Sequence, residues 1–440
     1  MKRRELLKVP FYLGASTLMG SLLQKAYAAS DYKALVCIFL HGGNDSFNML
    51  VPRNQALYDV YQRARGNMHV SESDLAAPAF TDNDSVPYAL PLSMPFTQTL
   101  ADAGKVAAVA NIGPRGPEPI VGDGGIPRLF SHNDQQSQWM TLQGASDLRT
   151  GWAGRLDDIW DAQPPLNYSV SGNNLWQLGE VSKPYIMSLQ SGVRKFDNLN
   201  PASTWQLERK RHQSIVELLR AGGSSPAERY YAKSMLRAME LSELHYGVVN
   251  YDPLNDPFAG LFNDVTNPLL RQMRYVALTM RGRNILGANR HIFYVSLGGF
   301  DTHDHQLENH PKLLAQLDAG IKGLYQACAG LGITENVTIF TASEFGRTLT
   351  SNGDGTDHGW GGHQLVIGDA VRGGKIYGKM PSLSLGSDDD FGFGRIKPSL
   401  SVEQYVADLL VWFGLSESQI NQVLPNLPSF AQRSLGYMQV

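Results

Sequence analysis

Five short apolar runs constrain the fold of this chain more than any other feature of its sequence. The first, Ala34 to Leu40, is continuously apolar and is closed by His41-Gly42-Gly43. Fully buried parallel strands have this character, because both of their faces are covered. The five runs that we predict to be strands span residues 34–40, 106–112, 291–297, 337–341 and 364–368.

Helical patterns lie between these runs. Leu313 to Leu331 and Val402 to Phe413 carry apolar residues at helical spacing. The strand–helix alternation predicts an α/β fold, with a doubly wound, mostly parallel sheet and helices on both faces. From about residue 201 to 290 the strand signal vanishes, and residues 207–219 and 228–246 are candidate helices. We therefore expect a single α/β domain over residues 29–440, with a helical insertion at about 201–290.

The N-terminus has the form of an export signal. Residues 2–8 read K-R-R-E-L-L-K, residues 11–23 are apolar, and Ala26-Tyr27-Ala28 forms an A-x-A cleavage site. The apolar run is too short for a bilayer core of about 30 Å, which needs roughly 20 residues. We expect residues 1–28 to be read by the twin-arginine translocase. The protein would then reach the periplasm or the extracellular space without a transmembrane anchor. An ordinary secretory signal or a retained N-terminal anchor is the alternative.

Charge and cysteine content narrow the function classes. The chain has a formal net charge of −3, of which residues 1–28 contribute +4, so the remainder carries −7. Such a surface repels nucleic acid, and we expect no nucleic-acid partner. Cys37 and Cys328 are the only cysteines. Because both lie in apolar runs, we predict two buried free thiols rather than a disulfide, which suits folding in a reducing cytoplasm.

Acids and histidines gather just beyond the predicted strands. In doubly wound sheets, ligands bind beyond the carboxyl ends of the strands. Each of these segments alone could be a solvated turn or a helix cap. Together they supply the mixed oxygen and nitrogen ligands that zinc or manganese prefers, and calcium is a further candidate. Two such ions can clamp the attacking and leaving oxygens of a phosphoryl or sulfuryl transfer. The candidate metal ligands are Asp45, Asp301, His303, His305, Glu344, His358 and His363.

Three further residues are candidates for catalysis. Ser131 fits the N-cap of a helical stretch, where its hydroxyl would lie in the positive field of the helix N-terminus. That position suits a nucleophile for an anionic substrate, although a plain N-cap is the simpler interpretation. His132 follows it. Arg347 comes after the fourth run and could bind an anionic group bidentately, or could form a structural ion pair.

Four motifs resemble one known family, the domain-of-unknown-function 1501 family of exported bacterial proteins. They are G-G-F-D-T-H (298–303), T-A-S-E-F-G-R-T (341–348), D-H-G-W-G-G-H (357–363) and L-H-G-G-N-D-S (40–46). That family is in turn distantly similar to the alkaline phosphatase and sulfatase superfamily. The resemblance therefore implies an alkaline-phosphatase-like core.

The distant resemblance also implies a ligand set. Asp301 and His305 match an Asp-x-x-x-His motif, with His363 as a late histidine on the same ion. Asp45 would hold a second ion together with the nucleophile and an Asp-His pair. Here the chain departs from the pattern, because Ser343-Glu344 stands in place of that pair. Glu344 and His358 could replace it; otherwise the second ion is weakened or absent.

Two functions follow as hypotheses. The first is an exported metal-dependent hydrolase of phosphate or sulfate esters, with a serine nucleophile and one or two divalent ions. Its substrate would be a small anionic ester or a polysaccharide. The alternative is a catalytically degenerate cell-envelope binding or assembly protein of the same fold.

Overall fold

The computed structural model describes most of the chain after the predicted signal. The described residues are 32–142, 149–160, 165–189, 192–193, 196, 198–249, 256–258 and 260–439. The export signal predicted at residues 1–28 lies outside them, so it stays a prediction.

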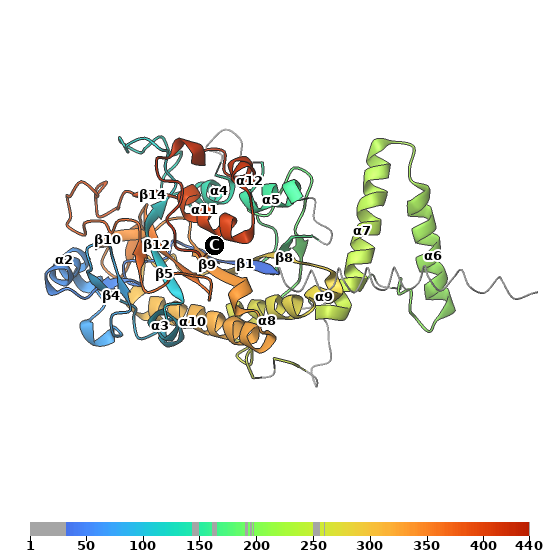
Figure 1. The fold of residues 1–440 in the computed structure, drawn as a ribbon, viewed down its shortest axis with the longest axis horizontal. Helices are drawn as coiled ribbons and strands as arrows, with labels where there is room; N and C mark the ends of the chain where they lie inside the picture. Colours follow the sequence, from blue (N-terminus) through green and yellow to red (C-terminus); the bar gives the residue numbers. More distant parts are fainter. Residues whose placement is uncertain are drawn as a thin grey trace, which may run out of the picture.

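A mixed sheet, nine-stranded within the described residues, forms the centre of the protein (Figure 1). Its order is β13-β5-β12-β9-β1-β8-β6-β7, with β14 also paired to β5. All pairings are parallel except those of β12, which runs antiparallel to β5 and β9. The strands are β1 (Lys33–Leu40), β5 (Val106–Gly113), β6 (Asn167–Ser169), β7 (Tyr185–Ile186), β8 (Arg290–Leu297), β9 (Val337–Ala342), β12 (Gly362–Ile367), β13 (Ile376–Tyr377) and β14 (Leu400–Ser401).

The α/β class and the mostly parallel sheet predicted from the sequence are confirmed, and all five apolar runs are strands. The exception to the parallel order, β12, has a local cause. A parallel neighbour needs a crossover of a dozen or more residues, usually a helix. Between β9 and β12 the chain instead forms a hairpin of β10 (Arg347–Ser351) and β11 (Thr356–His358). The chain therefore re-enters the sheet from the end at which it left, and β12 runs backward.

Helices cover both faces of the sheet (Figure 1). Along β1, Val36 and Ile38 face one apolar cluster, whereas Cys37 and Phe39 face the other, as a strand period of two requires. Cys37 and Cys328 are buried free thiols, as predicted. The first cluster is completed by α3 (Pro95–Asp102), α8 (Pro268–Arg281) and α10 (Gln306–Leu331). The second is completed by α4 (His132–Thr141), α5 (Trp152–Trp160), α11 (Val402–Phe413) and α12 (Glu417–Val423).

The helical stretch at residues 201–290 has two parts. The helices α6 (Gln206–Ala221) and α7 (Pro226–Val249) form a hairpin that projects from the body (Figure 1). None of the residues of α6 is buried. In contrast, α8 packs against the sheet, with Met273 and Val276 fully buried. The hairpin therefore stands apart from the core except at the end of α7, where Val248 and Val249 join the first apolar cluster.

Smaller elements complete the described chain. None of its helices is long and apolar enough to cross a membrane. The remaining elements are β2 (Val51–Pro52), β3 (Phe80–Thr81), β4 (Pro87–Ala89), α2 (Gln55–Arg65) and α9 (Arg283–Leu286), with short 3-10 turns at Gly66–Met68, Glu72–Asp74, Thr334–Asn336 and Leu427–Ser429.

Candidate metal centre

The candidate site lies beyond the carboxyl ends of three adjacent parallel strands, β9, β1 and β8. Gly42 follows β1 and links the other two ends. Its N–H donates to Glu344 Oε1 at 2.9 Å, and its carbonyl accepts from Arg347 Nη1 at 3.1 Å. Gly42 has φ +118°, and a Cβ there would lie 2.2 Å from the backbone nitrogen of Asp301. Only glycine allows this close approach.

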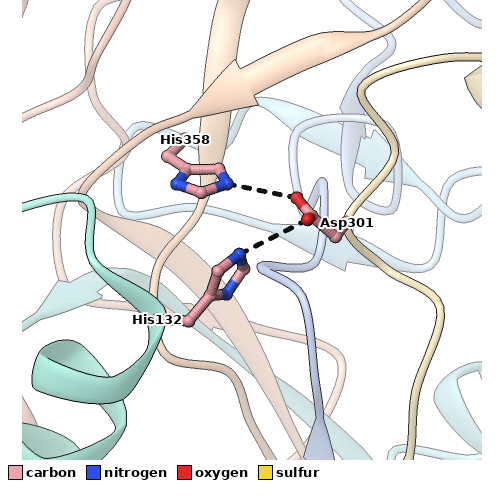
Figure 2. A group of neighbouring side chains, drawn as sticks. All are labelled: His132, Asp301 and His358. Carbon is pink, nitrogen blue, oxygen red and sulfur yellow. Dashed lines mark hydrogen bonds and ion pairs between the residues drawn. The ribbon is translucent and has the colours of Figure 1, made fainter.

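The carboxylate of Asp301 is the centre of the site (Figure 2). Arg347 Nη1 donates to its Oδ1 at 2.7 Å, and His358 Nε2 lies 3.1 Å from the same oxygen. His303 Nε2 lies 3.0 Å from Oδ1, and His132 Nε2 lies 3.4 Å from Oδ2. Three imidazole rings from three segments therefore direct Nε2 at one carboxylate.

The other ring nitrogen of each histidine faces an acceptor. His132 Nδ1 lies 2.8 Å from Glu344 Oε1, and His358 Nδ1 lies 2.7 Å from the carbonyl oxygen of Phe130. His303 Nδ1 lies 3.0 Å from Asp357 Oδ1. A carbonyl or an ionised carboxylate can only accept, so each Nδ1 carries the proton. In its neutral form each ring therefore presents an Nε2 lone pair to Asp301.

Lone pairs directed at a carboxylate need a cation between them, or a second proton on each ring. The need is sharpest where His303 Nε2 and His358 Nε2 lie 3.0 Å apart. Metal-bound histidines have this arrangement, with the non-ligating N–H held by a carboxylate or a carbonyl. The donor atoms of His132, Asp301 and His358 all lie within 4.8 Å of one another. The residues therefore fit a divalent ion with mixed nitrogen and oxygen ligands.

The local charge also favours a cation. Three carboxylates (Asp301, Glu344 and Asp357) surround the centre, and one guanidinium, that of Arg347, opposes them. Burial would raise the pKa of Glu344, but hydrogen bonds, first from His132, hold it below its usual value. The pKa of Asp301 is likewise lowered: burial opposes this, but the hydrogen bond and charge of Arg347 outweigh it. Both groups therefore stay ionised, and one divalent ion would balance the set.

The pKa values of His132 and His358 shift in opposite directions. The hydrogen bond to Glu344 raises the pKa of His132, against the effect of partial burial. Burial lowers the pKa of His358, and the positive charges of Arg347 and His132 add to the effect. His358 is thus the ring that is neutral, and ready to accept a metal, over the wider pH range.

Arg347 forms the ion pair that was one of its two predicted roles. Its side chain has no exposed surface. Besides Asp301 and Gly42, it donates through Nε to Thr356 Oγ1 at 3.3 Å and through Nη2 to the carbonyl of Thr356. A guanidinium enclosed in this way fixes Asp301 and does not reach a ligand in solution.

Three predicted metal ligands lie outside the centre, and a fourth, Glu344, binds Nδ1 of His132 and is not one of the grouped metal-binding residues. Asp45 is fully buried and pairs with Arg65 and Gln306. His305, which precedes α10 and has φ +48°, is largely exposed, and its Nδ1 lies 3.4 Å from Asp354 Oδ2. His363 is fully buried, and its Nδ1 accepts from the N–H of Asn111 at 3.0 Å. A neutral His363 ring therefore carries its proton on Nε2 and has no lone pair for a metal. The described residues thus assemble one centre around Asp301 and no second one around Asp45.

Ser131 is the N-cap residue of α4, but its side chain makes no hydrogen bond to the helix backbone. Its hydroxyl instead donates to Asp134 Oδ2 at 2.6 Å. The preceding residue, Phe130, has φ +73°, and its carbonyl holds His358. Ser131 therefore lies in the chain directly between the carbonyl that orients His358 and the side chain of His132.

Three supporting groups were not predicted from the sequence. Asp357 precedes His358 in the D-H-G-W-G-G-H motif, so its position next to a candidate ligand was a usable signal. Gln136 donates to Glu344 Oε1 at 3.2 Å, and it lies one helical turn after His132. The carbonyl of Phe130 has no sequence signal, because every residue offers one.

The family resemblance is confirmed over part of the chain. Residues 255–421 match the model of a family described as "Protein of unknown function (DUF1501)". Three of the four motifs quoted above lie inside this match. No curated protein matches the chain.

Two solved structures are similar to the chain at a low level. The crystal structure of Ps i-CgsB has a TM-score of 0.36 and 11% identity, over 92% of this chain and 77% of that one. The crystal structure of Ps i-CgsB in complex with k-i-k-neocarrahexaose has a TM-score of 0.33 and 9% identity, over 88% and 74%. This similarity is too low to support an argument, so the fold class rests on the sheet topology described above.

Proposed function

We propose that this protein is an exported hydrolase of phosphate or sulfate esters that uses one divalent metal ion. His132, Asp301 and His358 would hold the ion, with His303 as a fourth donor. The observation that supports this proposal is the orientation of the rings: each directs Nε2 at Asp301 while its Nδ1 faces an acceptor. Because the proposed ligands are mostly nitrogen atoms, we propose that the ion is zinc or manganese rather than calcium, which prefers oxygen ligands.

A divalent ion bound there would supply Lewis-acid polarisation of the ester group. The work of the chain is to hold the ligands in place. Glu344 orients His132, the carbonyl of Phe130 orients His358, and Asp357 orients His303. Arg347 contacts Asp301 through Oδ1 only, which leaves Oδ2 as the less committed oxygen.

Ser131 is the nucleophile in this proposal, and Asp134 is its base. The hydrogen bond of 2.6 Å from Ser131 Oγ to Asp134 Oδ2 gives the proton a destination. Oγ would bond to the phosphorus or sulfur as its proton passes to Asp134, and the ester oxygen would leave with the electron pair of the broken bond. Asp134 passes its proton to the departing oxygen. Water then cleaves the serine ester: the water oxygen stays on the released phosphate or sulfate, and one water proton restores Oγ–H.

Export by the twin-arginine translocase is part of the same proposal. Ligands that come from α4, β11 and the end of β8 meet only in the folded protein, so metal binding follows folding. A route that carries folded proteins lets the ion be loaded in the cytoplasm. Replacement of Arg3 and Arg4 by lysine should leave the uncleaved precursor inside the cell, as seen by fractionation and mass measurement. Normal export of this variant would contradict the route.

Metal analysis of the mature protein, purified from its native envelope without chelators, tests the metal proposal. We expect about one divalent ion per chain, lost in His132→Ala and His358→Ala but kept in His305→Ala, since His305 lies outside the centre. The metal-loaded protein should hydrolyse aryl phosphates or aryl sulfates, and Ser131→Ala should abolish turnover while it keeps the metal. A metal-free protein that stays inactive after addition of zinc, manganese or calcium would falsify the proposal.

A second function is supported by the pairing of Asp45 with Arg65. Arg65 and Gln306 both bind Oδ2 of Asp45, and the carboxylate has no exposed surface through which a second ion could enter. A one-metal relative without hydrolytic activity would serve as a binding or assembly protein of the cell envelope. This second function predicts that the metal-loaded protein shows no turnover. It also predicts that Ser131→Ala does not change the phenotype of the cells that produce the protein.

A further inference from the structure

A short turn beside the candidate metal centre carries groups that the proposed mechanism does not use. Gly392 to Arg395 form this turn, in which the N–H of Phe391 donates to the carbonyl of Arg395 at 2.8 Å. The turn is anchored to β10, because Leu349 N–H donates to the carbonyl of Gly394 at 2.8 Å. Thr350 Oγ1 donates to the carbonyl of Phe393 at 2.7 Å. The turn is therefore held rigidly against the hairpin that also carries His358.

Arg395 connects this turn to the centre. Its Nε donates to the backbone carbonyl of His358 at 3.2 Å. Its guanidinium lies over the ring of Phe130, 4.6 Å from the centroid, and 5.5 Å from the centroid of Phe393. His358 and Phe130 thus contact Arg395 and also take part in the metal centre, so Arg395 lies next to that centre. Among the described residues no carboxylate pairs with Arg395, and its two terminal nitrogens have no protein partner there.

This arginine differs from Arg347 in the property that matters for a ligand. Arg347 is enclosed, and its donors are used by Asp301, Gly42 and Thr356. Arg395 is only partly buried and has an open pair of parallel donors. Two parallel N–H groups match two oxygens of a tetrahedral oxyanion. The stacking on two phenyl rings holds the fork in one orientation before a ligand arrives.

The aromatic residues of the turn are exposed in a way that the fold does not require. Phe393 is 79% exposed and has φ +59°, a left-handed conformation that is unusual for a large side chain. Phe391 is 36% exposed, and its ring packs edge-to-face with Trp360 and at a tilt against Phe130. Backbone strain of this kind is unfavourable and gathers at ligand sites. Exposed phenyl faces beside a guanidinium suit a ligand that has both a ring and an anionic group.

We propose that Arg395 and Phe393 form the substrate subsite of the metal centre, and that the substrate is a phosphate or sulfate ester carried on a ring. The proposal rests on the proposed function above. Arg395 binds two non-bridging oxygens of the ester group, and Phe393 stacks on the ring that carries it. The ion only balances the carboxylates around the centre, so Arg395 supplies the further positive charge that attracts an anion. A sugar ring and an aryl ring share the required face, so both are candidates.

Calorimetric titration of the metal-loaded mature protein tests the subsite. The probes are inorganic phosphate, inorganic sulfate, glucose 6-phosphate, glucose 6-sulfate and the two p-nitrophenyl esters. We expect Arg395→Gln to weaken binding of every probe at least tenfold while metal content stays at the wild-type level. Arg433→Gln is the control, because Arg433 is an exposed arginine that pairs with Glu417 of α12 and not with any residue of the turn or the centre. Phe393→Ala should weaken the ring-bearing esters but leave the inorganic ions unchanged, and the ester that loses most identifies the kind of ring.

The outcomes separate this inference from the proposed function. If Arg395→Gln binds all probes as the wild type does, the subsite is wrong while the hydrolase stands. Arg395→Lys takes its place in this test if Arg395→Gln does not fold. If the wild type binds none of the probes, the subsite is also wrong. If the protein binds ring-bearing esters through Arg395 but does not turn them over, the subsite stands and the hydrolase fails.

Discussion

Replacement of Glu344 by glutamine should weaken metal binding although Glu344 is not one of the proposed ligands. Its Oε1 accepts three hydrogen bonds, from the N–H of Gly42, from His132 Nδ1 and from Gln136 Nε2. Glutamine keeps the shape and one acceptor oxygen but loses the charge. The bond from His132 then changes from charge-assisted to neutral, which roughly halves its strength. His132 thereby becomes a poorer donor to the metal and loses part of its fixed orientation.

The magnitude follows from the size of such effects. Removal of a group that orients a metal-bound histidine costs about 10- to 100-fold in affinity, or about 1.4–2.7 kcal/mol. The stability of the metal-free protein should change far less. Loss of a buried charge offsets part of the lost hydrogen bonding, since desolvation of the carboxylate was itself unfavourable. Glu344→Ala, in contrast, leaves three donors without an acceptor, at about 1–3 kcal/mol each if they stay unsatisfied, and should unfold the site.

Competition with a chromophoric chelator measures the metal affinity of the purified variants. Asp354→Asn is the matched control, because Asp354 faces the exposed His305 in the same way but outside the centre. We expect the control to bind metal as the wild type does. Wild-type affinity in Glu344→Gln, with its fold intact by circular dichroism, would refute the ring-orientation argument on which the metal centre rests.

Three further predictions concern stability. Gly42→Ala should lower the free energy of unfolding by more than about 3 kcal/mol or prevent folding, because its Cβ would overlap the backbone of the neighbouring strand end. Gly104 also has a positive φ, +71°, but open space around it, so Gly104→Ala should cost only about 1 kcal/mol; denaturant unfolding measures both. On the projecting hairpin, Leu218→Gln should change stability by less than about 0.5 kcal/mol, whereas Leu269→Ala in α8 should cost about 2–5 kcal/mol. The free energy of unfolding should fall as the pH drops below about 6.5, by up to about 2 kcal/mol per ring at pH 5, and flat stability over that window would contradict this. Burial lowers the pKa of three enclosed rings, that of His291 to about 3 and those of His310 and His363 to about 4. The stability that each neutral ring contributes is fully present above the pKa of the unfolded chain. It is lost as the pH falls toward the lower pKa of the folded protein.

Most of the fold could be predicted from the sequence because its strands are buried on both faces. Continuous apolar runs closed by glycine mark such strands without help from tertiary context, as in β1 and β8. The same logic placed Asp301, Glu344 and His358 at one edge of the sheet. The reversal of β12 could not be read, since it depends on the β10–β11 hairpin, whose residues carry no strong strand pattern.

That reversal also separates two histidines of one motif. His358 lies on β11 at the rim of the centre, with its side chain 20% exposed. His363, five residues later, lies on β12 and is fully buried against Phe47. Their sequence environments are alike, so the sequence favours both as ligands equally. In the structure the hydrogen bond at Nδ1 also distinguishes them: His358 faces a carbonyl, and His363 faces an N–H.

The two strand-end aspartates show why this chain has one candidate centre and not two. Asp45 and Asp301 each pair with a fully buried arginine. Asp45 is itself enclosed, so with Arg65 it forms a neutral pair with no surface open to an ion. Asp301 is 45% exposed and shares its single arginine with the nearby carboxylates of Glu344 and Asp357. The negative charge left uncompensated there, together with three Nε2 lone pairs, is what a divalent cation would satisfy. A variant that removes Arg65 should therefore destabilise the protein, because the buried charge of Asp45 loses its cationic partner and keeps only Gln306. It should not create a second site, because His363 would still present a proton rather than a lone pair.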